Sequence, residues 1–173
     1  MKKYMKVFVI GILILTCLLW LNSQRFEKYT GKSLNIGVIG EIPDVKEKMI
    51  AFENLEFNDL EKESKLMKYD AIFITEENLQ EASKKEYAPV YNKCVVPFFF
   101  IKDTKGPIPF IAEEITYEDA EQLSDSPPFA TGILKKNGEL IFREYGFYND
   151  IENKKHIEEA YSRIFKDIAE NKE

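Results

Sequence analysis

Polar residues that could take part in chemistry follow three short apolar runs of the sequence. The runs are residues 34–39, 71–74 and 98–101, and the polar residues after them are Glu41, Thr75, Glu76, Glu77, Lys102 and Asp103. If the runs are parallel strands of one sheet, their carboxyl ends share an edge, where α/β proteins commonly bind ligands. Carboxylates that converge at such an edge can hold a hard cation such as Mg²⁺ or Ca²⁺.

Two glycines, Gly37 and Gly40, form a G-x-x-G pattern at the end of the first apolar run. A glycine there lets a phosphate approach the backbone of the following helix. The full G-x-G-x-x-G fingerprint is absent, however, and the carboxylate of Glu41 repels a phosphate. A tight turn at the strand end is the competing interpretation.

These patterns select one set of candidate ligand-binding residues at the edge of the predicted sheet. The set is Gly37, Gly40, Glu41, Thr75, Glu76 and Asp103. The competing interpretation is that the acids only stabilise helix N-termini, where the helix dipole favours negative charge. We expect no cofactor and no resident metal, because the sequence has no dinucleotide fingerprint and no spaced His or Cys ligands.

The acidic edge resembles the corresponding edge of receiver-like and flavodoxin-like folds. The receiver pattern has an aspartate inside the end of a strand, whereas this sequence has Ile74 and Thr75 at that place. The resemblance therefore implies an α/β fold and does not extend to phosphorylation chemistry.

The usual nucleophiles and bases are scarce in this sequence. His156 is the single histidine, so a His-rich zinc site or an ordinary Ser-His-Asp triad has no obvious partners. Cys94 begins an apolar run and has no second cysteine or base beside it, which favours an inert buried thiol over a redox group. We therefore predict that the domain has no hydrolytic or redox activity of its own.

The N-terminus has the layout of a membrane anchor. Residues Val7–Leu21 are uncharged and mostly apolar, and they follow Lys2, Lys3 and Lys6. No A-x-A processing site follows them, which favours an anchor that is not cleaved. Cleavage, including lipidation at Cys17, is the competing interpretation. We predict a cytoplasmic tail at 1–6, a single-pass signal anchor at 7–21 that contacts the lipid bilayer, and a tether at 22–33.

Charge separates the N-terminal segment from the remainder of the chain. Residues 1–25 hold four of the 24 basic side chains and no acidic one, so residues 26–173 carry 20 basic and 30 acidic groups, a net charge of −10. The N-terminal lysines favour a cytoplasmic N-terminus and a domain outside the cytoplasm. The negative field makes nucleic acid a poor partner.

The first half of the exported domain predicts alternating strands and helices. Helices are expected over residues 43–52, with an Asp44-x-x-Glu47 capping box, and then over 59–67 and 76–87, where Pro89 ends the last one. A short strand is expected at 55–57. Strands that are apolar on both faces, alternating with helices, indicate a mainly parallel sheet in a three-layer domain.

The second half predicts a different arrangement. An edge strand is expected at 108–111, a short helix at 116–123, and a hairpin of 129–134 and 139–147 around Asn137-Gly138. A final amphipathic helix is expected from about Asn149 to Glu170. Pro128, the hairpin, Gly146 and this helix resemble the C-terminal half of thioredoxin-like domains, which makes a thioredoxin-like fold the alternative for an α/β domain at 34–171.

Together these features predict a membrane-anchored, extracytoplasmic α/β protein. We expect a non-catalytic module of the cell envelope that binds an envelope protein partner or a small ligand. The alternatives are a cation-dependent enzyme that uses the acidic edge, and a degenerate thioredoxin-like protein.

Overall fold

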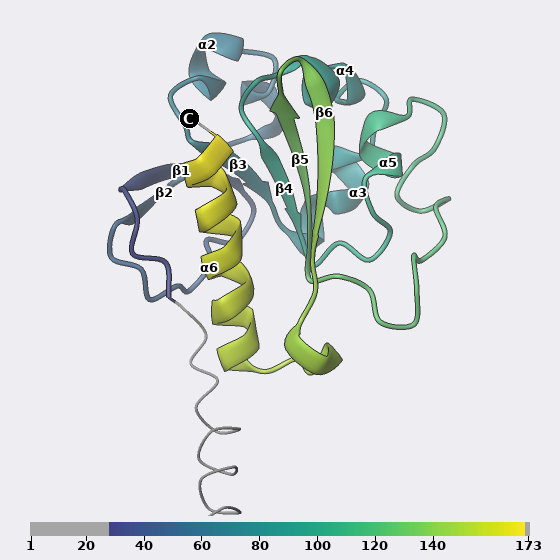
Figure 1. Ribbon diagram of the computed structural model, residues 1–173. Helices are drawn as coiled ribbons and strands as arrows, with labels where there is room; N and C mark the ends of the chain where they lie inside the picture. Colours follow the sequence, from purple (N-terminus) through teal and green to yellow (C-terminus); the bar gives the residue numbers. More distant parts are fainter. Residues whose placement is uncertain (1–27, 172–173) are drawn as a thin grey trace, which may run out of the picture.

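The computed structural model describes residues 28–171, and within them six strands form one sheet in the order β2-β1-β3-β4-β5-β6 (Figure 1). They are β1 (Leu34–Ile39), β2 (Ile50–Asn54), β3 (Ala71–Ile74), β4 (Phe98–Ile101), β5 (Ala130–Lys136) and β6 (Glu139–Tyr145). Strands β2, β1, β3 and β4 are parallel, and β5 and β6 continue the sheet antiparallel. The prediction of a single α/β domain with a mainly parallel sheet is confirmed.

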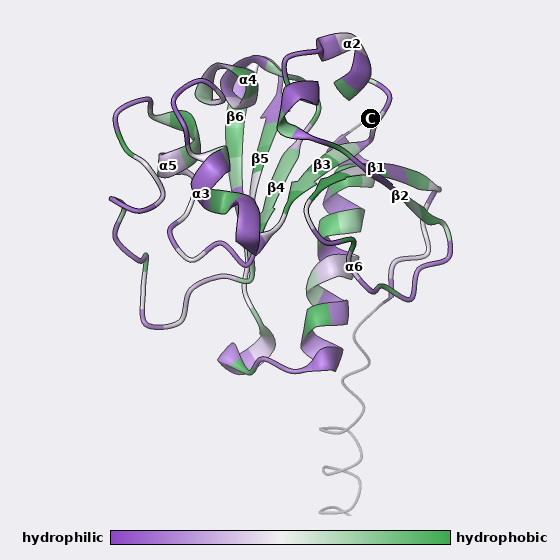
Figure 2. Ribbon diagram, turned by 180° about the vertical axis from the view of Figure 1, so that it is seen from behind, coloured by the Kyte–Doolittle hydropathy of each residue, from purple (hydrophilic) through white to green (hydrophobic). Residues whose placement is uncertain are grey.

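Helices cover both faces of the sheet, so the domain has three layers (Figures 1 and 2). One face packs against α6 (Lys154–Asn171), and the other lies beneath four short helices. These are α2 (Glu63–Leu66), α3 (Leu79–Ala82), α4 (Ala88–Lys93) and α5 (Ile108–Ile111). Single turns of 3-10 helix, η1 (Phe57–Asp59), η2 (Glu76–Asn78) and η3 (Tyr148–Asp150), complete the connections.

Aromatic side chains of the central strands fill both layers of the core. On one face, Phe73 of β3 stacks on Phe165 of α6 with ring centroids 6.3 Å apart. On the other, Phe100 of β4 stacks on Phe110 of α5 at 3.6 Å. Because β3 and β4 are buried on both faces, they read as unbroken apolar runs in the sequence, and Figure 2 shows them as hydrophobic along their length.

The first crossover differs from the prediction. Residues 43–52 were expected to be a helix, but residues 40–49 connect β1 to β2 without one, and Ile50–Asn54 pairs with β1 as a parallel strand. Glu47, the expected capping acid, is instead buried and accepts a hydrogen bond of 2.9 Å from Ser162 Oγ of α6. A tertiary partner replaces the local capping interaction, and the strand lies at 50–54 instead of 55–57.

The prediction that Pro89 ends a helix was wrong. The expected helix 76–87 is divided into η2 and α3, and α4 begins at Ala88 with Pro89 in its first turn. The missing amide hydrogen of a proline costs nothing there, because the first-turn amides have no partner within the helix.

Pro109 also opens a helix, since residues 108–111 form α5 and not the expected edge strand. The expected helix at 116–123 is absent from the structure. Thr116 Oγ1 instead donates to Asp119 Oδ2 at 2.6 Å in a local turn. The burial of Phe110 against β4 explains why the 108–111 segment turns towards the core and does not extend along the sheet edge.

The final helix begins later than expected, at Lys154. Asn149 has a φ of 53°, outside the helical region, and lies in η3. The N-terminal cap is Asn153, whose side-chain Oδ1 accepts the amide hydrogen of His156 at 3.0 Å.

The hairpin is confirmed, with Lys136 opposite Glu139 around a two-residue turn. Asn137 and Gly138 have φ values of 54° and 85°, as a tight hairpin turn requires. The hairpin and helix that resemble thioredoxin-like domains are therefore present, and the hairpin continues the sheet beyond the four parallel strands β2-β1-β3-β4.

The predicted tail at 1–6 and anchor at 7–21 lie outside the described residues, as does the tether up to residue 27. Across residues 28–171, none of the helices combines the length and apolar character needed to cross a membrane.

Candidate functional site

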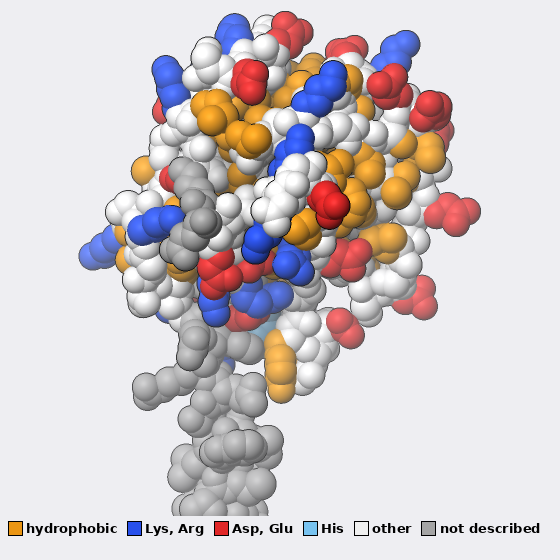
Figure 3. Space-filling model, turned by 45° about the horizontal axis from the view of Figure 1, so that its top comes forward, with side chains coloured by type: hydrophobic (Ala, Val, Ile, Leu, Met, Phe, Trp, Pro, Cys, Tyr) orange, Lys and Arg blue, Asp and Glu red, His pale blue; other side chains and the backbone are white. Residues whose placement is uncertain are grey.

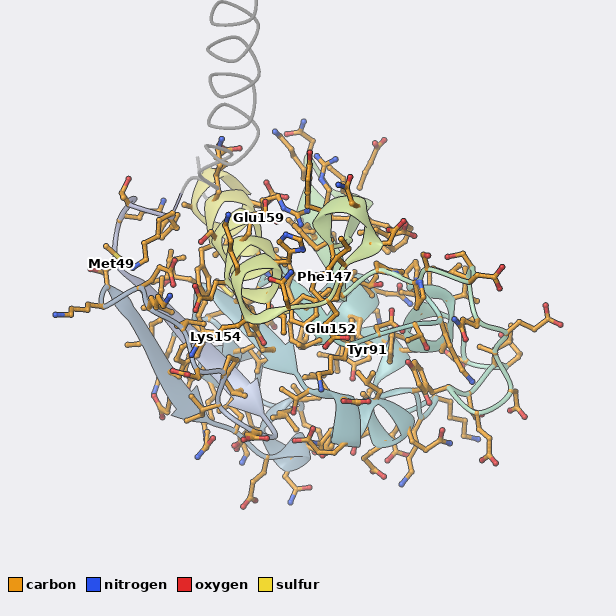
Figure 4. All side chains as sticks on the ribbon, turned by 90° about the horizontal axis from the view of Figure 1, so that it is seen from below. Met49, Tyr91, Phe147, Glu152, Lys154 and Glu159 are labelled. Atoms are coloured by element: carbon orange, nitrogen blue, oxygen red, sulfur yellow. The ribbon has the colours of Figure 1, made fainter. Side chains whose placement is uncertain are left out.

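Two adjoining hollows lie where the four parallel strands end, at the carboxyl edge of the sheet. The larger has a volume of about 360 Å³ and the smaller about 190 Å³. Glu76 and Lys102 line both hollows, and their side chains form an ion pair of 2.9 Å between them. We call the two hollows together the carboxyl-edge cleft. In Figure 4, which looks onto this end of the molecule, Phe147 and Glu152 of the larger hollow lie beside the start of α6.

A compact network ties the end of β1 to the end of β3. The hydroxyl of Thr75 donates to Glu77 Oε1 at 2.7 Å, and the backbone amide of Glu41 donates to the same oxygen at 2.9 Å. Partial burial alone would raise the pKa of the Glu77 carboxyl, but these hydrogen bonds lower it below its usual value. Glu77 is therefore a fixed negative charge in the wall of the smaller hollow.

Gly40 makes this network possible. Its φ of 116° is one that residues with a side chain rarely adopt. A Cβ atom at Gly40 would collide with Thr75 Oγ1 and lie 2.5 Å from Glu77 Oε1. The backbone of β1 thus turns directly against the end of β3, and this places Glu41 at the rim of the smaller hollow.

The structure brings together three of the sequence-predicted site residues and separates two others from them. Glu41, Thr75 and Glu76 all line the smaller hollow. Gly37 lies inside β1, where an added Cβ would be 2.5 Å from Leu55 Cδ1, so its role is close packing of the core.

Asp103 is the second residue that lies apart. It is fully buried, its Oδ1 accepts the Lys105 amide hydrogen at 2.9 Å, and it does not line either hollow. Its Oδ2 atom and the Thr131 hydroxyl oxygen are both buried without a hydrogen-bond partner among the described residues. Burial raises the pKa of this carboxyl, although the nearby Thr131 hydroxyl and the Lys105 amide act in the opposite direction.

The raised pKa of Asp103 leads to a prediction about stability and pH. Folding favours the protonated form of this carboxyl. The stability that Asp103 contributes is therefore fully present below its unfolded pKa of 3.8, and it is lost as the pH rises through the folded-state pKa. Asp103→Asn resembles the protonated form, keeps an acceptor for Lys105 and offers a donor towards Thr131. We expect the free energy of unfolding of this variant at pH 7 to be higher than that of the parent protein.

Denaturant titrations of both proteins from pH 4 to pH 8 test this prediction, using Asp125→Asn as the matched exposed control. An Asp103→Asn variant that is less stable than the parent at pH 7, or one that keeps the same pH slope, would contradict the assignment.

The cleft contains acids that the sequence analysis missed. Besides Glu41, Glu76 and Glu77, its lining includes Asp44, Asp125, Asp150 and Glu152. These four come from the loops after β1 and before β5, and from the segment that leads into α6. Loop residues that are distant in sequence carried no spacing signal, and only the order of the strands places their loops at one edge.

Across the described residues, no group of three or more His, Cys, Asp or Glu side chains could hold a metal ion. The carboxylates of the cleft come from several separate segments of the chain and line both of its hollows. Such an arrangement suits contact with an extended cationic group better than coordination of a single ion.

The remaining reactive groups lie elsewhere. Cys94 lines an apolar groove of about 250 Å³ between α2 and α4, and burial raises the pKa of its thiol, which disfavours the nucleophilic thiolate. Figure 3 turns this end of the molecule forward and shows hydrophobic side chains interspersed with both charges. His156 is buried at the start of α6, with Nδ1 2.5 Å from the Ile151 carbonyl oxygen.

No family model, no curated protein and no solved structure matches this chain.

Proposed function

We propose that this protein is a membrane-anchored binding module of the cell envelope, without catalytic activity of its own. In this proposal, residues 7–21 hold it in the bilayer with the N-terminus in the cytoplasm. The domain that begins at residue 34 then binds a partner outside the cytoplasm. The observation that supports the proposal is the carboxyl-edge cleft, which is open and lies at the place where α/β sheets commonly bind ligands.

The charge of the cleft indicates the chemistry of the partner. Seven carboxylates and one lysine line the two hollows within the described part of the chain, and that lysine is already paired with Glu76. The potential in the cleft is therefore negative, and it attracts and orients a group of opposite charge. We take the ligand to be a Lys- or Arg-containing segment of an envelope protein.

A labelled octalysine peptide is a direct probe of this cleft. We expect the purified full-length chain in a non-ionic detergent to bind it with an affinity that falls as salt is raised. Glu76→Lys reverses the charge at the point that both hollows share, so it should weaken binding on the order of tenfold. Fluorescence anisotropy measures the dissociation constant of each variant.

Glu114→Lys is the matched control, because it makes the same charge change on an exposed residue outside both hollows. It should change the dissociation constant by about twofold or less, since distant surface charges are screened. Equal weakening by both variants would show that the peptide responds only to net charge, and the cleft would lose its assignment.

The predicted orientation in the membrane has its own test. Ser33 is exposed, and in a chain without Cys17 and Cys94 a cysteine at Ser33 should react with an impermeant maleimide on intact cells. Lys3→Cys should react only after lysis. Shielding of position 33 until lysis would reverse the orientation, and a mature N-terminus after residue 15 would remove the anchor.

The enzymatic alternatives predict turnover, which the binding module does not. Assays with cell-wall glycans, with and without Mg²⁺, test for a cation-dependent enzyme, and assays with disulfide substrates test for a thioredoxin-like activity. Two carboxylates alone can perform acid–base hydrolysis, so Glu41→Gln and Glu76→Gln are the informative variants for the acidic edge, and Cys94→Ser for the thiol. Turnover that one of these substitutions abolishes would overturn the proposal.

A further inference from the structure

Strand β6 is the outer edge of the sheet on the side of the hairpin. Within residues 28–171 it pairs with β5 alone and stands last in the sheet order (Figure 1). It has seven residues, which is long for an unpaired edge, and such an edge is a template for another strand.

The hairpin turn fixes which residues of β6 offer their main chain to a partner. Lys136 and Glu139 close the two-residue turn as a directly opposed pair. Opposed residues of an antiparallel ladder alternate between hydrogen-bonded and non-hydrogen-bonded pairs. Counting from the turn, the amide and carbonyl groups of Leu140, Phe142 and Glu144 face away from β5.

Leu140, Ile141 and Tyr145 of β6 pack against the core, whereas the other side chains of the strand are exposed. Phe142 is 42% exposed, although it is a large apolar residue on a strand. Glu139 and Arg143 are on the same face of β6, four residues apart, and neither forms an ion pair with any other described residue. An apolar ring and two opposite charges therefore lie along one unpaired edge.

We infer that β6 pairs antiparallel with β6 of a second copy of this chain, around a two-fold axis at Ile141. In this register Glu139 of each copy lies opposite Arg143 of the other, and Leu140 lies opposite Phe142 of the other. A two-fold interface must be complementary to itself, and this strand meets that requirement because its charges have opposite signs at equal distances from Ile141. The two sheets would join into one.

Neighbouring registers lack this complementarity. An axis at Phe142 places Leu140 opposite Glu144 and Ile141 opposite Arg143, so no opposite charges meet. An axis at Arg143 places two arginines opposite each other, which is unfavourable across a ladder. The charges on β6 thus select one register, as edge charges do when they exclude other pairings.

A cysteine at the axis tests the interface directly. In the full-length chain in detergent, with Cys17 and Cys94 replaced by serine, Ile141→Cys should form a disulfide-linked dimer under mild oxidation. Non-hydrogen-bonded antiparallel pairs have Cα atoms about 4.5 Å apart, within the range that a disulfide spans. Glu144→Cys is the control, because its two copies would be far from each other, and it should remain uncrosslinked.

Charge exchange tests the register without a crosslink. Light scattering of the full-length chain should show a dimer whose dissociation constant rises on the order of tenfold in Arg143→Glu and in Glu139→Arg. The double variant restores opposite charges across the axis and should recover the affinity of the parent. Recovery also excludes misfolding as the cause of the single effects.

Three results would overturn this inference. They are a chain that stays monomeric, an Ile141→Cys variant that crosslinks no better than Glu144→Cys, and a double variant that dimerises as weakly as the singles. The test does not depend on the cleft, so its failure leaves the proposed binding function unaffected.

Discussion

Replacing Gly40 by alanine is expected to destabilise the domain by roughly 2 to 6 kcal/mol, adding the usual costs of backbone strain and of overpacking. The φ of 116° is strained for alanine, and the new Cβ would collide with Thr75 Oγ1. To relieve the collision, β1 and β3 would have to separate at their carboxyl ends. Chemical denaturation followed by far-UV circular dichroism measures the change in unfolding free energy.

Gly138→Ala separates the two contributions to this loss. Gly138 also has a positive φ, of 85°, but an added Cβ would meet nothing within 4 Å. Its cost should be that of the backbone conformation alone, about 1–2 kcal/mol. If Gly40→Ala is no more destabilising than Gly138→Ala, then the close approach of β1 to Thr75 and Glu77 is not a constraint on this fold.

Ile164→Ala should lower the free energy of unfolding by roughly 2–5 kcal/mol, which is the range for a large apolar side chain removed from a packed core. Ile164 is fully buried in the core cluster between α6 and the sheet, where Phe73 and Phe165 also lie. The loss combines the transfer of apolar atoms with the cavity that they leave. The same denaturation experiment measures it.

Lys166→Ala on the same helix is the matched control, because Lys166 is exposed and alanine is at least as good a helix former. It should change stability by less than about 0.5 kcal/mol. A truncation after Asn153 extends the test, since it uncovers one face of the sheet and should prevent cooperative unfolding. An unchanged melting temperature after this truncation would show that α6 is not a structural layer of the domain.

Some parts of this fold could be predicted from the sequence because their signals are local. Strands β3 and β4 are unbroken apolar runs, since burial on both faces leaves no polar position in them, and β1 departs from this pattern only at the half-buried Asn35. The hairpin follows from Asn137-Gly138, which tolerates the positive φ values of a two-residue turn. The final helix follows from apolar residues at helical spacing that face one layer of the core.

Other elements could not be predicted because a distant partner decides them. The apolar residues in 45–52 have helical spacing. However, Ile50–Asn54 pairs with β1 as a parallel strand, and Glu47 accepts a hydrogen bond from Ser162 of α6. Residues 108–111 are as compatible with a strand as with a helix, and the stacking of Phe110 on Phe100 favours the helix. Propensity differences of a few tenths of a kcal/mol are small beside such contacts.

The candidate site, too, could be predicted from the sequence only in part. The sequence by itself determined that polar residues follow the apolar runs, and parallel pairing makes Glu41, Thr75 and Glu76 neighbours at one edge. Only the tertiary structure decided that Asp103 turns into the core. Its placement depends on the packing of the long connection between β4 and β5, which no periodicity encodes. Strand ends are set by local hydrophobicity, whereas the direction of a loop side chain is set by whichever distant surface it can reach.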